Sequence, residues 1–169
     1  MTTLTEDDVL EQLDAQGDLL SFITMANSML QHGVKQFLPS LFVNNDEEIM
    51  EYAVKPLLAR SGPLDDIDVA LRLIYALGKI DKEYYADIAH FSQFGQYLQE
   101  QKVIPNFTDD ICWDFICNVN CIIKNVTLYS ALTSMKFADF STWSELRFRG
   151  MIKTALVLAV TAILKELTP

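Results

Sequence analysis

The sequence predicts an all-α protein, built as a single-domain bundle of about seven to nine helices over residues 1–169. Hydrophobic residues make up 50% of the chain and charged residues 21%, a balance typical of globular proteins with a buried core. Six glycines and five prolines are few for 169 residues, which favours long helices over a turn-rich β fold. No segment shows the period-two alternation of a half-buried strand.

Eight segments have the features of helices. Within each, apolar residues recur at intervals of three and four, the spacing of one helix face, and glycine, proline or a polar loop separates neighbouring segments. In chain order the expected helices are 6–16, 19–41, 46–60, 67–77, 82–101, 109–123, 127–135 and 142–167.

Capping and breaking residues set the boundaries of the first two helices. Thr5 can cap the first helix and Gly17 ends it, because a hydroxyl oxygen accepts a free N–H of the first turn and glycine tolerates the chain reversal. Asp18 can cap the second helix in the same way. Gly33 and Pro39 predict a bend or a break in its second half.

The third helix begins at Asn45 or Asp46, and three acidic residues in its first turn suit the positive end of the helix dipole. Pro56 lacks an N–H and crowds the residue before it. We therefore expect this helix to kink, or to end, near Val54 or Lys55.

The remaining helices also follow capping residues. Asp81 and Thr108 precede the segments 82–101 and 109–123, and a shorter apolar segment follows them. The last expected helix, 142–167, becomes almost wholly apolar in its second half, which predicts that it is buried.

The net charge of −10 is unevenly distributed. Residues up to Asp68 include 13 acidic and 3 basic side chains, whereas the part from Val69 onward has 10 of each. An acidic surface repels the phosphate backbone, so direct binding to nucleic acid is not expected. Acidic side chains also keep proteins soluble, and an acidic docking surface is the alternative interpretation.

The sequence predicts a cytoplasmic protein without a membrane segment. The first residues, MTTLTEDDV, lack the basic and apolar regions of a signal peptide. The apolar run 150–164 contains Lys153 and is too short for ~30 Å of hydrocarbon. Three cysteines without a secretory signal indicate reduced thiols.

No motif of catalysis, metal binding or cofactor binding is present. Cys112, Cys117 and Cys121 have the spacing C-x4-C-x3-C on one expected helix, and core packing explains them better than a metal site does. His32 and His90 have no nucleophile or acid in a recognisable spacing. The chain is therefore expected not to be an enzyme and to hold no cofactor or metal.

Arg72 is the only basic residue within the apolar helix that follows the turn SGPLDD. Asp68 precedes it by four residues, the favourable order for an exposed helical ion pair. Alternatively, a partly buried Arg72 could form a hydrogen-bonded ion pair with a carboxylate such as Asp65, Asp66 or one on another helix, and so fix the packing of the bundle. The third interpretation makes Asp66 and Arg72 contacts for an anion or a partner.

The segment YAVKPLLARSGPLDDIDVALRLIYALGKIDKEYYADI (52–88) resembles the signature of the mannitol operon repressor family. The resemblance includes the start Tyr-Ala-Val-x-Pro-Leu-Leu, the turn Gly-Pro-Leu-x-Asp and the helix Arg-x-Leu-Ile-Tyr-x-Leu-Gly. The matching residues, mainly structural in character, include Tyr52, Pro56, Gly62, Pro63, Leu64, Asp66, Arg72, Tyr75, Leu77 and Gly78.

The resemblance implies an all-helical transcriptional regulator, repressor-like, without a standard DNA-binding motif. Such a protein would act indirectly, through contact with another regulatory protein or a transcription component, and could form a homo-oligomer through apolar helix faces. One alternative is a direct DNA-binding repressor that uses region 142–153, with Arg147, Arg149 and Lys153. Another is a small-molecule sensor of sugar-alcohol metabolism, with a pocket near Arg72 and Tyr75.

Overall fold

The computed structural model describes residues 4–138 and 142–169, and the side chains of the second range from Ser144 onward. The secondary structure of these residues is helical throughout, without a strand. The predicted fold class is confirmed. The elements are α1 (Glu6–Asp14), α2 (Leu19–Phe37), η1 (Leu38–Leu41), α3 (Glu47–Ile49), η2 (Met50–Val54), α4 (Lys55–Leu58), η3 (Pro63–Asp65), α5 (Ile67–Ala76), α6 (Lys82–Gln99), α7 (Asp110–Ile116), α8 (Asn120–Ile123), α9 (Val126–Lys136) and α10 (Thr142–Glu166).

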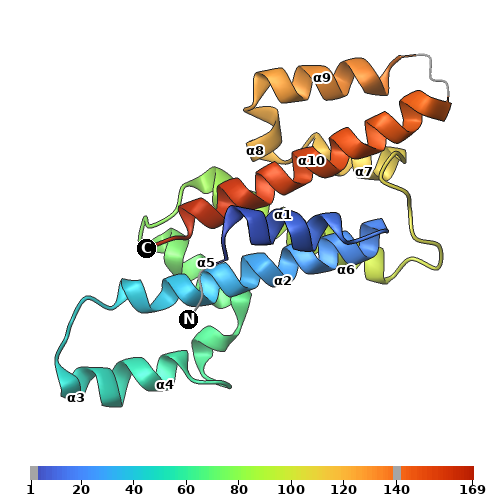
Figure 1. Ribbon diagram of the computed structural model, residues 1–169. Helices are drawn as coiled ribbons and strands as arrows, with labels where there is room; N and C mark the ends of the chain where they lie inside the picture. Colours follow the sequence, from blue (N-terminus) through green and yellow to red (C-terminus); the bar gives the residue numbers. More distant parts are fainter. Residues whose placement is uncertain (1–3, 139–141) are drawn as a thin grey trace.

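Helix α10 is the centre of the bundle. In Figure 1 it crosses the molecule between α1 and α2 on one side and α8 and α9 on the other, and it also contacts α6. Because helices pack against it from several directions, its second half is apolar nearly all round. Its buried side chains are Phe148, Ile152, Ala155, Leu156, Val157, Ala159, Val160 and Ile163.

Two glycines let the long helices approach one another closely. A Cβ on Gly33 of α2 would lie 2.9 Å from Leu164 of α10, and a Cβ on Gly95 of α6 would lie 2.5 Å from the amide nitrogen of Asn27 on α2. Gly33 therefore serves packing inside an unbroken α2. The expected break occurs four residues later, where Pro39 lies in the 3-10 turn η1.

The segments α3, η2 and α4 form one continuous helical arm, so the described chain has nine helices when the arm counts as one. The arm lies apart from the bundle in Figure 1, at the end of a loop. Of the two predicted start residues, Asp46 caps the arm, by accepting the N–H groups of Glu48 and Ile49. The widened π turn ends at Val54, two residues before Pro56, where the missing N–H and the ring disfavour regular α-helix.

The expected helix 109–123 is wrong as a single element, because α7 ends at Ile116 and α8 begins at Asn120. The carboxylate of Asp87 on α6 accepts the backbone N–H groups of Asn120 and Cys121 at 2.7 and 2.9 Å. Asp87 is fully buried. A side chain 33 residues earlier in the sequence thus caps a new helix start, which local pattern could not reveal.

Candidate functional site

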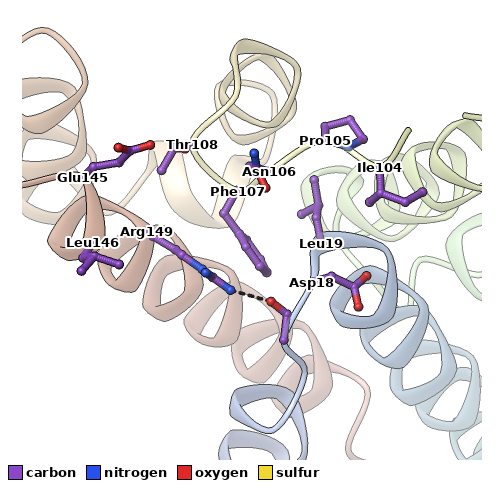
Figure 2. A pocket seen from close by; sticks show the side chains of 11 residues that line it. Asp18, Leu19, Ile104, Pro105, Asn106, Phe107, Thr108, Glu145, Leu146 and Arg149 are labelled. Atoms are coloured by element: carbon purple, nitrogen blue, oxygen red, sulfur yellow. Dashed lines mark hydrogen bonds between the residues drawn. The ribbon is translucent and has the colours of Figure 1, made fainter. Parts of the chain in front are cut away.

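A cavity of about 390 Å³ opens where three separate segments meet (Figure 2). Helix α10 forms one wall, the turn between α1 and α2 forms another, and the loop between α6 and α7 covers them. The lining residues are Gly17, Asp18, Leu19, Ile104, Pro105, Asn106, Phe107, Thr108, Glu145, Leu146 and Arg149.

Arg149 is the cation of this cavity, and its side chain is held in place. Its guanidinium donates a hydrogen bond to the carbonyl oxygen of Gly17, drawn in Figure 2, and lies 5.4 Å from the centre of the Phe107 ring. The ring face attracts the positive charge. A guanidinium has five N–H donors, so donors remain for a bound anion.

Lys153, one turn further along α10, stabilises the same turn. Its ammonium donates to the carbonyl oxygens of Asp14 and Gln16, each at 3.1 Å. It also lies 3.7 Å from the Asp14 carboxylate, and its side chain is only 16% exposed. Lys153 therefore fixes the end of α1 and the wall of the cavity that Gly17 belongs to.

Glu145 and Thr108 face each other across the mouth of the cavity. In Figure 2 the carboxylate of Glu145 points toward Thr108. Helix α7 begins at Asp110, with Asp109 at its N-cap and not Thr108. Asp109 accepts the N–H of Asn106 at 2.8 Å and so shapes the loop. Within the described residues, the side chains of Glu145 and Thr108 have no hydrogen-bond or ion-pair partner.

Asp18 has a structural role at the rim. Its carboxylate accepts the N–H and the hydroxyl of Ser21 at 2.9 and 2.7 Å, as expected of the cap of α2. These hydrogen bonds lower the pKa of Asp18 below its usual value. The carboxylate therefore stays ionised and bound to the start of α2.

Arg72 lines a second hollow of about 260 Å³ between α5 and α6, together with Asp68, Leu71, Tyr85, Ala89, Ser92, Gln93 and Gln96. The hollow is open, and Arg72 itself is exposed. Among the described residues Arg72 has no ion pair with Asp68 or with any other carboxylate. Its role as a contact for an anion or a partner stays a prediction.

The carboxylates near Arg72 in the sequence have other partners. Asp65 forms an ion pair with Lys35 on α2 at 3.0 Å, and this contact lowers the pKa of Asp65. Asp66 caps α5 by accepting the N–H groups of Asp68 and Val69. Asp66 does not line the Arg72 hollow, so the structure does not bring the two candidate contact residues into one cavity.

The other signature residues shape the arm and the turn after it. A Cβ on Gly62 would lie 2.5 Å from the carbonyl oxygen of Pro56, and Gly78 has a φ of 65° after the end of α5. Tyr75 stacks on Tyr85 with ring centroids 4.6 Å apart. Leu64 is buried, whereas Tyr52, Pro56, Pro63 and Leu77 are exposed.

The three cysteines lie in or against the core. Cys112 is buried and burial raises its pKa to about 12. Burial and the neighbouring Asp87 also raise the pKa of Cys121. Cys117 accepts a weak hydrogen bond from the hydroxyl of Tyr129 at 3.7 Å. The predicted packing role agrees with these positions, because raised pKa values disfavour the reactive thiolate.

The basic residues of region 142–153 do not gather on an outward face. Arg149 faces the cavity and Lys153 is mostly buried against the turn between α1 and α2. A protein that reads DNA presents its arginines and lysines together on one exposed surface. Separately, none of the described helices is both long enough and apolar enough to cross a bilayer.

The comparisons with known proteins identify two kinds of relative. The chain is 73% identical over 169 residues to the protein named Fumarase E of Shigella flexneri, covering 100% of both chains. It is 28% identical to the Mannitol operon repressor of Escherichia coli (strain K12), covering 99% of this chain and 84% of that protein.

Two crystal structures have the same fold. One is YggD from Shigella flexneri, described as a possible transcriptional regulator, with 70% identity, a TM-score of 0.91 and coverage of 99% of each chain. The other is MtlR from Escherichia coli in complex with HPr, with 26% identity, a TM-score of 0.80 and coverage of 97% of this chain and 98% of that chain.

The family model described as Mannitol repressor matches residues 5–168. This range includes the arm, both hollows and the central helix α10. The resemblance found in segment 52–88 therefore extends over nearly the whole chain, and the chain belongs to the mannitol repressor family.

Proposed function

We propose that this chain catalyses the reversible addition of water to fumarate to give malate. The observation that carries the proposal is the 73% identity over the full length to a protein named Fumarase E. The cavity on α10 supports it, since a volume of about 390 Å³ lies within the ~300–1,000 Å³ range of small-molecule sites. It also combines an arginine, which suits a carboxylate ligand, with a glutamate that has no partner among the described residues.

The motif analysis gave the opposite expectation, that the chain is not an enzyme, and this expectation stays a prediction. Motif patterns detect sites built from neighbouring residues. A site assembled from the segments around residues 17, 106 and 149 has no such pattern.

The deciding experiment measures hydration with purified full-length protein from a host that lacks its own fumarases. Malate formation from fumarate is followed by the loss of the ultraviolet absorption of fumarate and by proton NMR. The Escherichia coli mannitol operon repressor, prepared identically, serves as the control for contaminating activity. Turnover proportional to the concentration of this chain, and absent from the control, supports the proposal. Equal activity in both preparations contradicts it.

A second function is supported by the other relatives. We infer that the chain also acts in the cytoplasm as a repressor-like regulator through contacts with another protein, without direct binding to DNA. The MtlR structure with HPr shows a family member bound to a protein partner, and YggD is described as a possible transcriptional regulator. The inward position of Arg149 and Lys153 agrees with an indirect mechanism.

Two binding experiments test this second function. Calorimetric titration with HPr tests the protein contact seen in the MtlR structure, and affinity capture from lysate with and without nuclease tests for others. A partner retained after nuclease treatment supports the proposal. Sequence-specific DNA binding in the nanomolar range, measured at physiological salt, would refute the indirect mechanism.

A further inference from the structure

The cavity on α10 has the components that a dicarboxylate site needs. Arg149 supplies a fixed positive charge, because the Gly17 carbonyl and the Phe107 ring hold its guanidinium. A planar guanidinium can bind a carboxylate through two parallel hydrogen bonds. Asn106 and Thr108 supply neutral polar groups from the covering loop.

Glu145 provides the one carboxylate on α10 that faces this cavity. It lies four residues before Arg149, slightly more than one helical turn or ~6 Å along the axis. The two side chains form no ion pair within the described residues. Their charges are therefore separately available, one to bind an anion and one to accept a proton.

We propose that this cavity binds fumarate and malate, with Arg149 on one carboxylate, Asn106 and Thr108 on the other, and Glu145 as the general base. This assignment rests on the proposed hydratase function. It names the residues of the site, which neither the identity to known proteins nor the family match supplies.

The reaction balances with these residues and solvent alone. Glu145 removes a proton from water while the water oxygen bonds to one alkene carbon. The π electrons move to the adjacent carbon and spread into its carboxylate, where Arg149 stabilises the added negative charge. That carbon takes a proton from solvent and Glu145 returns its own proton to solvent. The net change is the addition of one water molecule, without oxidation or reduction.

The hollow around Arg72 is the competing location and has a similar pair, Asp68 and Arg72, four residues apart. Arg72 is exposed, however, and no described side chain or carbonyl holds it. An exposed charge is screened by water and must lose side-chain entropy on binding. Arg149 is half-buried and already fixed, which makes it the better anion ligand.

Binding and turnover of single variants test the assignment. Succinate is the probe for binding, because it has both carboxylates of the substrate and no double bond to hydrate. Arg149→Met is expected to weaken succinate binding at least about tenfold, through the loss of charge-assisted hydrogen bonds. Glu145→Gln is expected to keep succinate binding and KM while kcat falls about 10²–10⁴-fold, the usual contribution of a general base.

Matched variants separate a site from a folding defect. Arg60→Met removes an exposed arginine in the turn after the arm, which lines neither hollow, and should change neither binding nor turnover. Thr108→Val keeps the shape of the side chain and should raise KM with the thermal unfolding midpoint unchanged. Arg149→Lys should bind succinate more tightly than Arg149→Met, because lysine keeps the positive charge but cannot form the two parallel hydrogen bonds of a guanidinium.

The outcomes distinguish the site from the activity. If the chain hydrates fumarate and Arg149→Met keeps its KM and kcat, the assignment is overturned and the proposed function stands. Loss of binding in Arg72→Met alone overturns it in favour of the other hollow. If the chain neither hydrates fumarate nor binds succinate, both proposals fail. Succinate binding that requires Arg149, without hydration, supports the dicarboxylate site and refutes the hydratase.

Discussion

Replacing Asp87 tests the explanation for the break between α7 and α8. Its buried carboxylate accepts three hydrogen bonds, from the backbone N–H groups of Asn120 and Cys121 and from the side-chain amide of Asn120, at 2.7, 2.9 and 3.0 Å. Asp87→Leu removes all three. Asp87→Asn keeps one acceptor oxygen but places an NH2 group against one of the two N–H donors.

The expected loss of stability follows from the groups left without partners. In Asp87→Leu two backbone N–H groups at the start of α8 lose their acceptor, at about 1–3 kcal/mol each when buried. The amide of Asn120 is only half-buried and can turn to water. We therefore expect the free energy of unfolding to fall by about 3 kcal/mol, from the ~5–15 kcal/mol of a typical domain. In thermal unfolding, the same loss should lower the midpoint temperature by ~6–12 °C.

The assay is urea unfolding followed by far-ultraviolet circular dichroism, with Asp114→Asn as the control. Asp114 is exposed on α7, and its substitution removes the same charge without a buried contact. A loss below about 1 kcal/mol in Asp87→Leu would refute the argument, since it would show that the N–H groups find other acceptors. A loss equal to that of the control would refute it as well.

The thiol of Cys121 provides a second readout of the Asp87 carboxylate. Its pKa is raised by burial first and then by the hydrogen bond and the negative charge of Asp87. In Asp87→Asn the charge is gone, so the pKa of Cys121 should fall and its alkylation should begin at lower pH. An unchanged pH profile of alkylation would contradict the contact between the two side chains.

Four further substitutions have clear expectations. Gly62→Ala would place a Cβ 2.5 Å from the backbone oxygen of Pro56, so it should lower the free energy of unfolding by about 1–3 kcal/mol and speed proteolysis of the arm. In contrast, the Cβ of Gly150→Ala, at an exposed position on α10, meets no atom within 4 Å, and this substitution should stabilise the fold by ~0.5–1 kcal/mol. Lys153→Met keeps the apolar stem but loses two bonds to carbonyl oxygens, and denaturant unfolding should show a loss of about 1–3 kcal/mol. Because the pKa of Asp18 is lowered in the folded protein, its cap of α2 stabilises the fold above pH ~4. This contribution disappears as the pH falls through the lowered pKa. In Asp18→Asn, stability measured by circular dichroism should therefore depend less on pH in this acidic range.

The sequence determined the elements whose causes are local. Asp18 and Asp46 cap their helices through residues two or three positions away, and Pro39 lies where α2 gives way to a 3-10 turn. Hydrophobic period, capping side chains and proline act within one or two turns of helix, so their effects can be predicted from neighbouring residues. The family resemblance was local as well, because its signature lies in one continuous segment.

The tertiary structure decided the features that depend on distant residues. Asp87 divides one expected helix into α7 and α8 from 33 residues away. Arg149 donates a hydrogen bond to the carbonyl oxygen of Gly17, 132 residues away in the sequence. Its side chain therefore lines a cavity, whereas the sequence had made it a candidate contact for DNA. Arg72, for which the sequence left three interpretations open, forms no ion pair among the described residues and lines an open hollow. Hydrogen bonds and cavities form wherever packing brings groups together, and the packing of α1, α2, α6, α8 and α9 against α10 is not encoded in any one segment.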